Sequence, residues 1–416
     1  MKYLFTLILT LFTLVSFAQT SDVLEPLDIF DMELVGDPQI SPDGSKIVYV
    51  RNFKDIMTDG NRSNLWIINS DGTGHRPLTS GNQNDYAPRW SPDGSRLAYV
   101  SSMDGKPQIY MYWMKEGASA KITNLQQSPR SMQWSPDGKK IALIMTVKEE
   151  QKRFNVLPPK PKGAKWADPP IYIDEMKYRA DGRGYLEVSY SQIFLLAADG
   201  GTPRQMTDGE YNHNGISWAP DSKSIIFSAN HHGNEMEPRN SEIHELILAS
   251  GDIKTLTKRF GPDGSPKISP DGTKIAYLGQ DDNFDGYQVG KLYVMNRDGS
   301  GSKMLCDDLD RDIGNINWSA DGKSIVFQYD HHGNTYVSKT DMNGKRTQLA
   351  ENLGGLSLGR PYSAGTYSMA KNGNIAFTLG TTEHPADLAI AMGGKSKRLT
   401  WGNEDLIEYQ KLCKVE

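Results

Sequence analysis

The sequence predicts an all-β fold, a seven-bladed β-propeller of four-stranded blades, because two short motifs recur along the chain at a regular spacing. The first motif is the turn Ser-Pro-Asp-Gly or a close variant of it, which begins at residues 41, 91, 135, 219, 269, 319 and 370. Successive copies are 44 to 51 residues apart, except for one gap of 84 residues after the third copy. A period near 50 residues with one turn in each unit is typical of a propeller.

The second motif is a strand, then a turn rich in Asp and Gly, then a closing Leu-Thr pair. In the first unit, Leu65–Ile68 leads to Asp71-Gly72 and then to Leu78-Thr79, and the last copy of the motif closes on Leu399-Thr400. Because this motif recurs out of phase with the first, the two signals are independent. Chance similarity is therefore a poor explanation for the repeats.

Each unit contains enough β-favouring segments for four short strands. In the second unit, Tyr86–Trp90 precedes the turn at Ser91, and Arg96–Val100, Gln108–Trp113 and Ala120–Thr123 follow it. Pro presets φ in such a turn, and Asp and Gly accept its left-handed position. Four antiparallel strands make one blade. We expect blades at about 37–80, 81–124, 125–208, 209–258, 259–306, 307–350 and 351–401, with ends that can shift by a few residues.

The composition narrows the partners that this chain can be expected to have. The formal net charge is −5, with both signs mixed along the 416 residues. Such a balance gives no reason to expect nucleic acid or an anionic membrane surface as a partner. Because a propeller is modular, one repeat domain over residues 37–401 is a better count than two or three globular domains.

The two ends of the chain lie outside the repeats. Residues 1–18 have the pattern of a signal peptide, with a positive charge at position 2, an apolar run from 3 to 17 and small residues at 16 and 18. We therefore expect the mature protein to be periplasmic or secreted. Residues 19–36 should form a lead-in with a short helix, because Leu27, Phe30 and Leu34 have helical spacing. Residues 402–416 form an exit segment.

Four other features resemble a nucleophile motif, a metal site, a calcium loop and a disulfide, but the residues around them do not support these interpretations. Residues 355–359 match Gly-x-Ser-x-Gly, but Pro361 opposes the helix that a nucleophile must precede. The His-His pairs at 231–232 and 331–332 suggest a metal, yet adjacent side chains on an extended chain point in opposite directions. Residues 281–286 fit half of a calcium loop, but its twelfth position is Leu292 instead of Glu. Cys306 and Cys413 are the only cysteines, and we favour two unpaired thiols over a disulfide. We expect no metal and no cofactor.

The chain resembles the N-terminal propeller of the prolyl oligopeptidase family of serine peptidases, in particular its acylaminoacyl-peptidase and dipeptidyl-peptidase-five-like members. The residues that carry the resemblance are Asp37–Gly44, Ile171–Gly182, Leu356–Tyr362, and Leu399-Thr400 followed by Asn403–Leu406. The resemblance covers roughly residues 24–416. The turn repeats are shared with Tol-system propellers and are less specific than the 171–182 segment and the exit.

This resemblance implies a substrate-gating propeller in an exported serine exopeptidase or oligopeptidase that acts on short peptides. In the family, an α/β-hydrolase domain with a Ser, Asp and His triad follows the propeller. This chain ends where that domain would begin, so it resembles a fragment or a split member. We expect it to be inactive alone, with a missing or separate hydrolase domain as its partner. The alternative is a stand-alone periplasmic binding propeller of the Tol-system type.

The insertion in the third unit, about residues 148–190, is the best functional candidate in the sequence. It is rich in charge and in Pro, and long excursions from a rigid scaffold tend to carry function. By the resemblance, this region faces the hydrolase domain and the substrate cavity. We expect Glu175, Tyr178, Arg179 and Arg183 to bind substrate, with Arg179 meeting a peptide carboxylate and Glu175 meeting an amine. The alternative, which we favour, is a strut that packs against another domain or its own blade.

Overall fold

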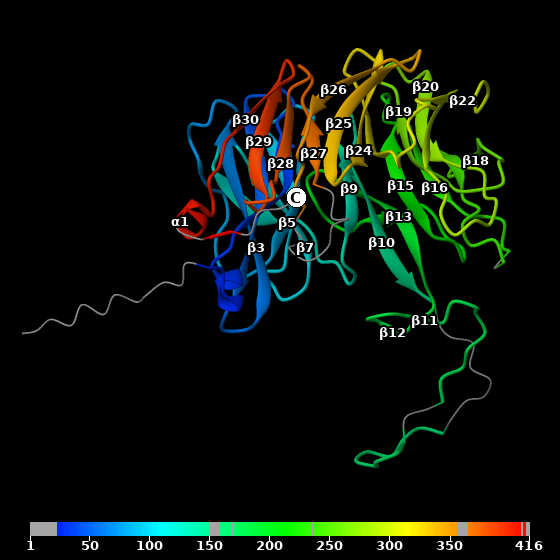
Figure 1. The fold of residues 1–416 in the computed structure, drawn as a ribbon. Helices are drawn as coiled ribbons and strands as arrows, with labels where there is room; N and C mark the ends of the chain where they lie inside the picture. Colours follow the sequence, from blue (N-terminus) through cyan, green and yellow to red (C-terminus); the bar gives the residue numbers. More distant parts are fainter. Residues whose placement is uncertain are drawn as a thin grey trace, which may run out of the picture.

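The computed structural model describes residues 23–149, 158–167, 170–234, 236–355, 365–408 and 411–412. These residues form seven four-stranded antiparallel sheets with almost no helix (Figure 1), which confirms the predicted fold class. The first strand of each blade lies next to the axis, because these strands contact one another around the ring. For example, β1 contacts β5 and β27, and β19 contacts β15 and β23.

The blades follow one another in sequence order. Blade one consists of β1 (Leu34–Ile40), β2 (Lys46–Asp55), β3 (Gly60–Asn69) and β4 (Arg76–Pro77), and blade two of β5 (Asp85–Trp90), β6 (Arg96–Ser101), β7 (Gln108–Trp113) and β8 (Ala118–Lys121). Blade three consists of β9 (Arg130–Trp134), β10 (Lys140–Lys148), β13 (Ser189–Ala197) and β14 (Arg204–Gln205), and the hairpin of β11 (Arg179–Ala180) and β12 (Gly184–Tyr185) lies between β10 and β13. Blade four consists of β15 (His213–Trp218), β16 (Ser224–Ala229), β17 (Glu242–Ile247) and β18 (Ile253–Thr255).

The last three blades repeat the same order. Blade five consists of β19 (Asp263–Ile268), β20 (Lys274–Gly279), β21 (Lys291–Asn296) and β22 (Lys303–Leu305). Blade six consists of β23 (Gly314–Trp318), β24 (Ser324–His331), β25 (Asn334–Asp341) and β26 (Arg346–Ala350), and blade seven of β27 (Tyr367–Met369), β28 (Ile375–Leu379), β29 (Asp387–Met392) and β30 (Lys395–Arg398).

The Ser-Pro-Asp-Gly turn joins the first two strands of a blade and is closed by its own side chains. In blade two, the Ser91 hydroxyl donates to the Asp93 carboxylate at 2.5 Å and accepts the Arg96 N–H at 2.9 Å. Gly94 has φ +72°, and a Cβ at this position would lie 3.6 Å from Cδ of Pro42 in the preceding blade. The motif therefore sets the turn and also the contact between neighbouring blades.

The Thr of the Leu-Thr motif ties the outer edge of a blade to its third strand. In blade two, the Thr123 hydroxyl accepts the Ile109 N–H at 2.9 Å and donates to the Gln108 side-chain oxygen at 3.0 Å. The same N–H to hydroxyl bond is made by Thr79, Thr207, Thr257 and Thr400, each at 2.9 Å. The Thr hydroxyl thus satisfies a buried main-chain N–H near the start of the third strand, without a further strand to pair with it.

Tryptophans at the end of the first strand join four of the blades to the one before. The Trp90 indole N–H donates to the main-chain carbonyl of Gln39 at 2.9 Å. Equivalent bonds run from Trp134 to Arg89, from Trp218 to Gln133 and from Trp318 to Lys267. The aromatic at this position, which the sequence shows before four of the turns, thus connects two blades.

The first strand of six blades contains a register shift at one residue with positive φ. These residues are Asp37 (φ 41°), Ala87 (φ 53°), Ser131 (φ 52°), Gly215 (φ 62°), Ser265 (φ 50°) and Asn315 (φ 48°). A bulge of this kind bends the strand and increases its twist. Its recurrence next to the axis indicates that the crowded inner strands need this bend.

The N-terminal lead-in differs from the predicted helix. The helical part is a single 3-10 turn, η1 (Pro26–Phe30), and Leu34, which the spacing assigned to the helix, is the first residue of β1. The exit segment contains the short helix α1 (Glu404–Ile407). The predicted signal peptide and Cys413 lie outside the described residues, and the Cys306 thiol is buried. No helix in the described part of the chain is long and apolar enough to cross a lipid bilayer.

Candidate functional site

One face of the propeller carries the connections between second and third strands and those between consecutive blades. In an antiparallel four-stranded blade these two kinds of connection lie at the same end, which we call the loop face. The insertion of blade three leaves from this face, as do the lead-in and the exit segment. Several exposed apolar side chains lie on it, namely Ile56, Met57, Met103, Met236, Phe260, Phe284, Tyr287 and Trp401.

The hairpin of β11 and β12 projects from the propeller body (Figure 1). The four predicted site residues lie between positions 175 and 183, in this hairpin or just before it. Glu175 accepts a hydrogen bond from the Tyr190 hydroxyl at 3.2 Å, and burial together with this carboxylate raises the pKa of Tyr190 to about 12. Tyr178 stacks on Tyr185, with ring centroids 6.3 Å apart. Arg179 lies in β11. The structure thus turns Glu175 towards the blade and places Tyr178 on the hairpin.

The hairpin leaves the two arginines of the predicted site exposed. Arg179 and Arg183 form no ion pair within the described residues. The cavity between residues 171–178 and 185–188 has a volume of about 30 Å³, which is room for little more than a water molecule. Large apolar side chains are nevertheless exposed here, namely Trp166, Ile171, Tyr172, Ile173, Met176, Tyr178 and Tyr185. The described residues of the insertion therefore present an apolar surface and charged groups around a cavity of about water size.

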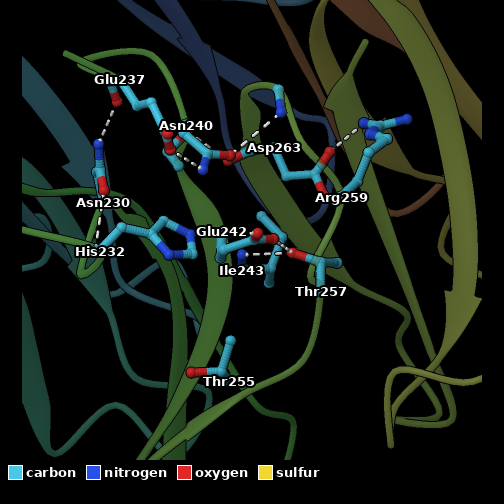
Figure 2. Close-up of polar contacts among 12 residues, drawn as sticks. Asn230, His232, Glu237, Asn240, Glu242, Ile243, Thr255, Thr257, Arg259 and Asp263 are labelled. Atoms are coloured by element: carbon cyan, nitrogen blue, oxygen red, sulfur yellow. Dashed lines mark hydrogen bonds and ion pairs between the residues drawn. The ribbon is translucent and has the colours of Figure 1, made fainter. Parts of the chain in front are cut away.

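A buried polar cluster lies where blade four meets blade five (Figure 2). The Thr257 hydroxyl donates to Glu242 at 2.5 Å, and the His232 imidazole lies 3.5 Å from the other oxygen of that carboxylate. Asp263 forms an ion pair with Arg259. Both carboxyl groups are at most 2% exposed, and burial raises the pKa of Glu242 and of Asp263. Two acids in one dry environment disfavour the doubly charged state.

Two buried histidines, His213 and His244, and the half-buried His231 form a second cluster in blade four. The Nε2 atoms of His213 and His231 lie 3.3 Å apart, and the ring centroid of His244 lies 4.4 Å from that of His231. His213 bonds to the Ser191 carbonyl at 3.0 Å and His244 to the Ala229 carbonyl at 3.1 Å. Burial lowers the pKa of His213 and of His244 to about 4. These rings are therefore neutral members of the core at neutral pH.

The sequence drew attention to His231 and His232 but not to the buried carboxyl groups, although one signal for Glu242 was present. Glu242 occupies the position that Gln108 and Gln192 hold in blades two and three. In each case the next residue donates its N–H to the Thr of the Leu-Thr motif. Aligning the repeats by this position would have marked Glu242 as a buried carboxyl. Of the predicted His-His pair, His231 points to His213 and His232 to Glu242, so the two rings serve different clusters.

The described residues contain no group of three or more His, Cys, Asp or Glu side chains arranged to hold a metal ion. In the calcium-like loop, the Gln288 side chain bonds to the Asn283 N–H and the Asp281 carbonyl, which closes the loop on itself. The Gly-x-Ser-x-Gly match at 355–359 lies, apart from its first residue, outside the described residues.

Comparison with known proteins shows what this propeller is similar to. Residues 161–352 match the family described as "Acylaminoacyl-peptidase, N-terminal beta-propeller domain". Residues 31–166 match the "TolB beta propeller domain". The propeller is therefore similar to those of acylaminoacyl peptidases and, over its first blades, to those of the Tol system.

Peptidases are among the curated and solved proteins that are similar to this chain. Dipeptidyl-peptidase 5 of Porphyromonas gingivalis is 26% identical over 324 residues, which are 74% of this chain and 46% of that protein. The acylaminoacyl peptidase of Pyrococcus horikoshii superposes with a TM-score of 0.67 at 16% identity, over 92% of this chain and 54% of that one. The β-propeller domain of the Trilobed protease from Pyrococcus furiosus has a TM-score of 0.60 at 16% identity, over 90% of this chain and 97% of that one. The chain matches less than half the length of the curated peptidase.

Proposed function

We propose that this propeller selects substrates for an exported serine exopeptidase or oligopeptidase that hydrolyses short peptides, with an α/β-hydrolase domain as its partner. The observation that carries the proposal is the pairing of the lead-in with the exit segment on the loop face. The Glu33 N–H donates to the Asn403 side chain and the Asn403 amide donates to the Glu33 carbonyl, both at 2.7 Å. Both segments are thereby held beside each other on the face that carries the insertion and the exposed apolar side chains.

The similarity to peptidases supports this assignment, because the match to the P. horikoshii enzyme uses nearly the whole of this chain but only 54% of that protein. A second domain beside the propeller would bury the apolar loop face, which a soluble propeller otherwise exposes to water. In this arrangement the propeller narrows access for folded proteins and admits short peptides. The triad lies on the partner, so the propeller alone has no turnover.

Within this proposal, the insertion of blade three contacts the partner or the substrate. Arg179 and Arg183 are exposed and unpaired within the described residues, so either can receive a peptide carboxylate in a bidentate contact. Tyr178 and Tyr185 offer a stacked aromatic surface beside them. Glu175 would meet an amine only after releasing its hydrogen bond from Tyr190.

The test is to label an extract of the native source with a fluorophosphonate, which reacts with activated serines, and to immunoprecipitate with an antibody against this propeller. We expect a labelled serine hydrolase, either on the same polypeptide or bound to it. The purified propeller should not cleave aminoacyl or dipeptidyl chromogenic amides. Turnover by the purified propeller would contradict the division of labour proposed above.

Precipitation of the propeller without any labelled protein would favour a different function. The match of residues 31–166 to the TolB propeller family supports a stand-alone periplasmic binding propeller as the second candidate. In that case the apolar loop face would bind another envelope protein. The two candidates differ in one readout, the presence of a reactive serine in the precipitate.

A further inference from the structure

A pocket lies on the loop face at the junction of blades four and five. Three connections build it, from residues 236–240 between β16 and β17, 260–261 between β18 and β19, and 282–284 between β20 and β21. Its volume is about 230 Å³. Met236, Phe260 and Phe284 form apolar walls and are 69%, 42% and 71% exposed. The two Phe rings lie 5.6 Å apart between centroids.

Hydrogen bonds between the three connections hold the pocket open in one shape. The Asp282 N–H donates to the Phe260 carbonyl at 3.0 Å, and the Gly261 N–H donates to the Asn240 side chain at 3.1 Å. A Cβ at Gly261 would lie 2.0 Å from the Gln280 carbonyl oxygen, so the connections approach too closely for any other residue. The walls are therefore pre-organised, which lowers the entropy cost of binding.

The backbone of Phe284 is strained in a way that the fold itself does not require. Its φ is +59°, in the left-handed region that bulky residues avoid. The Asp282 carboxylate holds this conformation by accepting the Phe284 N–H at 2.9 Å. Because the ring is largely exposed and meets the Phe260 ring at the pocket, little packing offsets the strain. Strain of this kind points to a binding role.

The charges around the pocket favour a cationic neighbour. Arg239 and Asp282 neutralise each other in an ion pair at 3.0 Å. The Glu237 carboxylate accepts hydrogen bonds from the amides of Asn234 and Asn240, at 2.9 and 3.1 Å, and no cation among the described residues pairs with it (Figure 2 shows Glu237 and Asn240). Neutral amides orient this carboxylate but leave its charge in place.

We propose that this pocket binds one large apolar side chain of a short peptide, with a positive charge next to it in the peptide. An apolar cavity of roughly 150 Å³ is enough for benzene, so this pocket accepts a Phe, Leu or Met side chain. The two Phe rings and Met236 provide the offset aromatic and sulfur contacts that such a side chain prefers. Glu237 then attracts a Lys or Arg at the neighbouring position. The inference rests on the proposed function, because peptide is the substrate class named there.

The test uses the propeller alone and capped dipeptides, with binding followed by saturation-transfer NMR of the peptide. We expect N-acetyl-Phe-Lys-amide to bind at least several-fold more tightly than N-acetyl-Phe-Glu-amide and N-acetyl-Ala-Lys-amide. Phe284→Ala should weaken binding by about five-fold or more, the usual loss for an aromatic anchor. Phe284→Asn, which tolerates positive φ, separates the loss of the ring from any change in the loop. Met103→Ala removes an exposed loop-face residue outside the pocket and should leave binding unchanged.

Glu237→Gln tests whether the charge of Glu237 causes the preference for the Lys peptide. A purely structural role of Glu237 would not change this preference. The substitution should bring the affinities for the Lys and Glu peptides to within about two-fold of each other, because the attraction is between charges. Equal binding by Phe284→Asn and the native chain, or no preference for the Lys peptide, would overturn the pocket assignment. Either result leaves the fluorophosphonate experiment untouched, so failure of this site and failure of the peptidase assignment are distinguishable.

Discussion

The Nε2 atoms of His213 and His231 lie 3.3 Å apart, so the first strand of blade four and the loop that follows its second strand meet through two imidazoles. His213 is fully buried and also bonds to the Ser191 carbonyl of blade three. Because Nδ1 of His213 donates to that carbonyl, its Nε2 accepts the hydrogen bond from Nε2 of His231, so His213 must be neutral for the contact to persist. The junction between blades three and four depends on neutral histidine.

We expect the stability of the propeller to fall as the pH drops below about 6.5. Burial lowers the pKa of His213 and His244 to about 4 in the folded state, whereas an unfolded histidine titrates near 6.5. Between these values the unfolded chain takes up protons that the folded chain does not, so the free energy of unfolding decreases. The contribution is complete above pH 6.5 and is lost as the pH falls through 4, roughly 3 kcal/mol for each ring. Urea unfolding between pH 7.5 and 4.5 measures it.

The control for this prediction is the double variant His213→Gln with His244→Gln. It should be less stable at pH 7.5 but should have a flatter dependence on pH. Glu242 and Asp263 work in the opposite direction, because their raised pKa adds stability as the pH falls. A double variant whose curve runs parallel to that of the native chain would show that the histidines are not responsible.

Glu242→Gln should stabilise the propeller at neutral and alkaline pH. Gln fills the same position in blades two and three, where it accepts the same hydrogen bond from Thr. Burial raises the pKa of Glu242, so its charged form costs stability above that pKa, and removing the charge should gain about 1 kcal/mol. The gain should shrink as the pH falls towards 5. Chemical unfolding at pH 8 and pH 5 tests both statements.

Asp387→Asn is the matched control in blade seven and should have the opposite sign. Asp387 holds the equivalent position, but it forms an ion pair with Arg398 at 2.5 Å and accepts the Thr400 hydroxyl at 2.7 Å. Loss of this charge removes the buried partner of Arg398 and leaves only the more exposed Glu404 paired with it, at 2.8 Å, so the chain should be destabilised. If both variants changed stability in the same direction, the ion pair would not be what separates the two sites.

Ser265→Gly should stabilise the inner strand of blade five by about 0.5 kcal/mol, because the left-handed conformation is unfavourable for residues with a Cβ. Ser265 has φ +50°, at the bulge that recurs in six blades. The reverse change, Gly215→Ala in blade four, should destabilise, since its Cβ would lie 3.1 Å from Cδ of Pro266. Thermal unfolding of the two variants gives melting temperatures that should move in opposite directions.

Trp318→Phe should cost about 1 to 2 kcal/mol, because it removes the hydrogen bond between the indole N–H and the Lys267 carbonyl. The indole N–H lies 2.8 Å from that oxygen. Trp401→Phe is the control, since Trp401 is 58% exposed and donates no hydrogen bond among the described residues. Equal effects of the two variants on urea unfolding would mean that the inter-blade bond contributes little.

The fold could be predicted because each repeat must form the same turn and satisfy the same main-chain groups. A turn must close between the first two strands, and the Ser, Asp and Gly side chains and backbone do this in every blade where they occur. A Thr must satisfy the strand end, and it recurs for that reason. Residues that repeat for physical reasons are visible in the sequence.

The candidate sites were harder to predict, since their residues break the repeats. The length of the insertion drew attention to Arg179, but nothing in the sequence indicated that Glu175 would turn towards Tyr190. Phe260 and Phe284 lie in connections without periodicity, and only the folded chain brings them together. His213 resembles a surface residue until its strand is known to lie against the axis.

The tryptophan bonds between blades end on main-chain carbonyls, and this choice of acceptor has an evolutionary consequence. Gln39, Arg89, Gln133 and Lys267 supply the four acceptors, and their side chains, two neutral amides and two cations, do not determine the bond. A blade can therefore be copied, moved or exchanged within the gene and still be joined to whichever blade precedes it. Mutation at these first-strand positions can change the side chains near the axis while the hydrogen bonds between the blades stay the same.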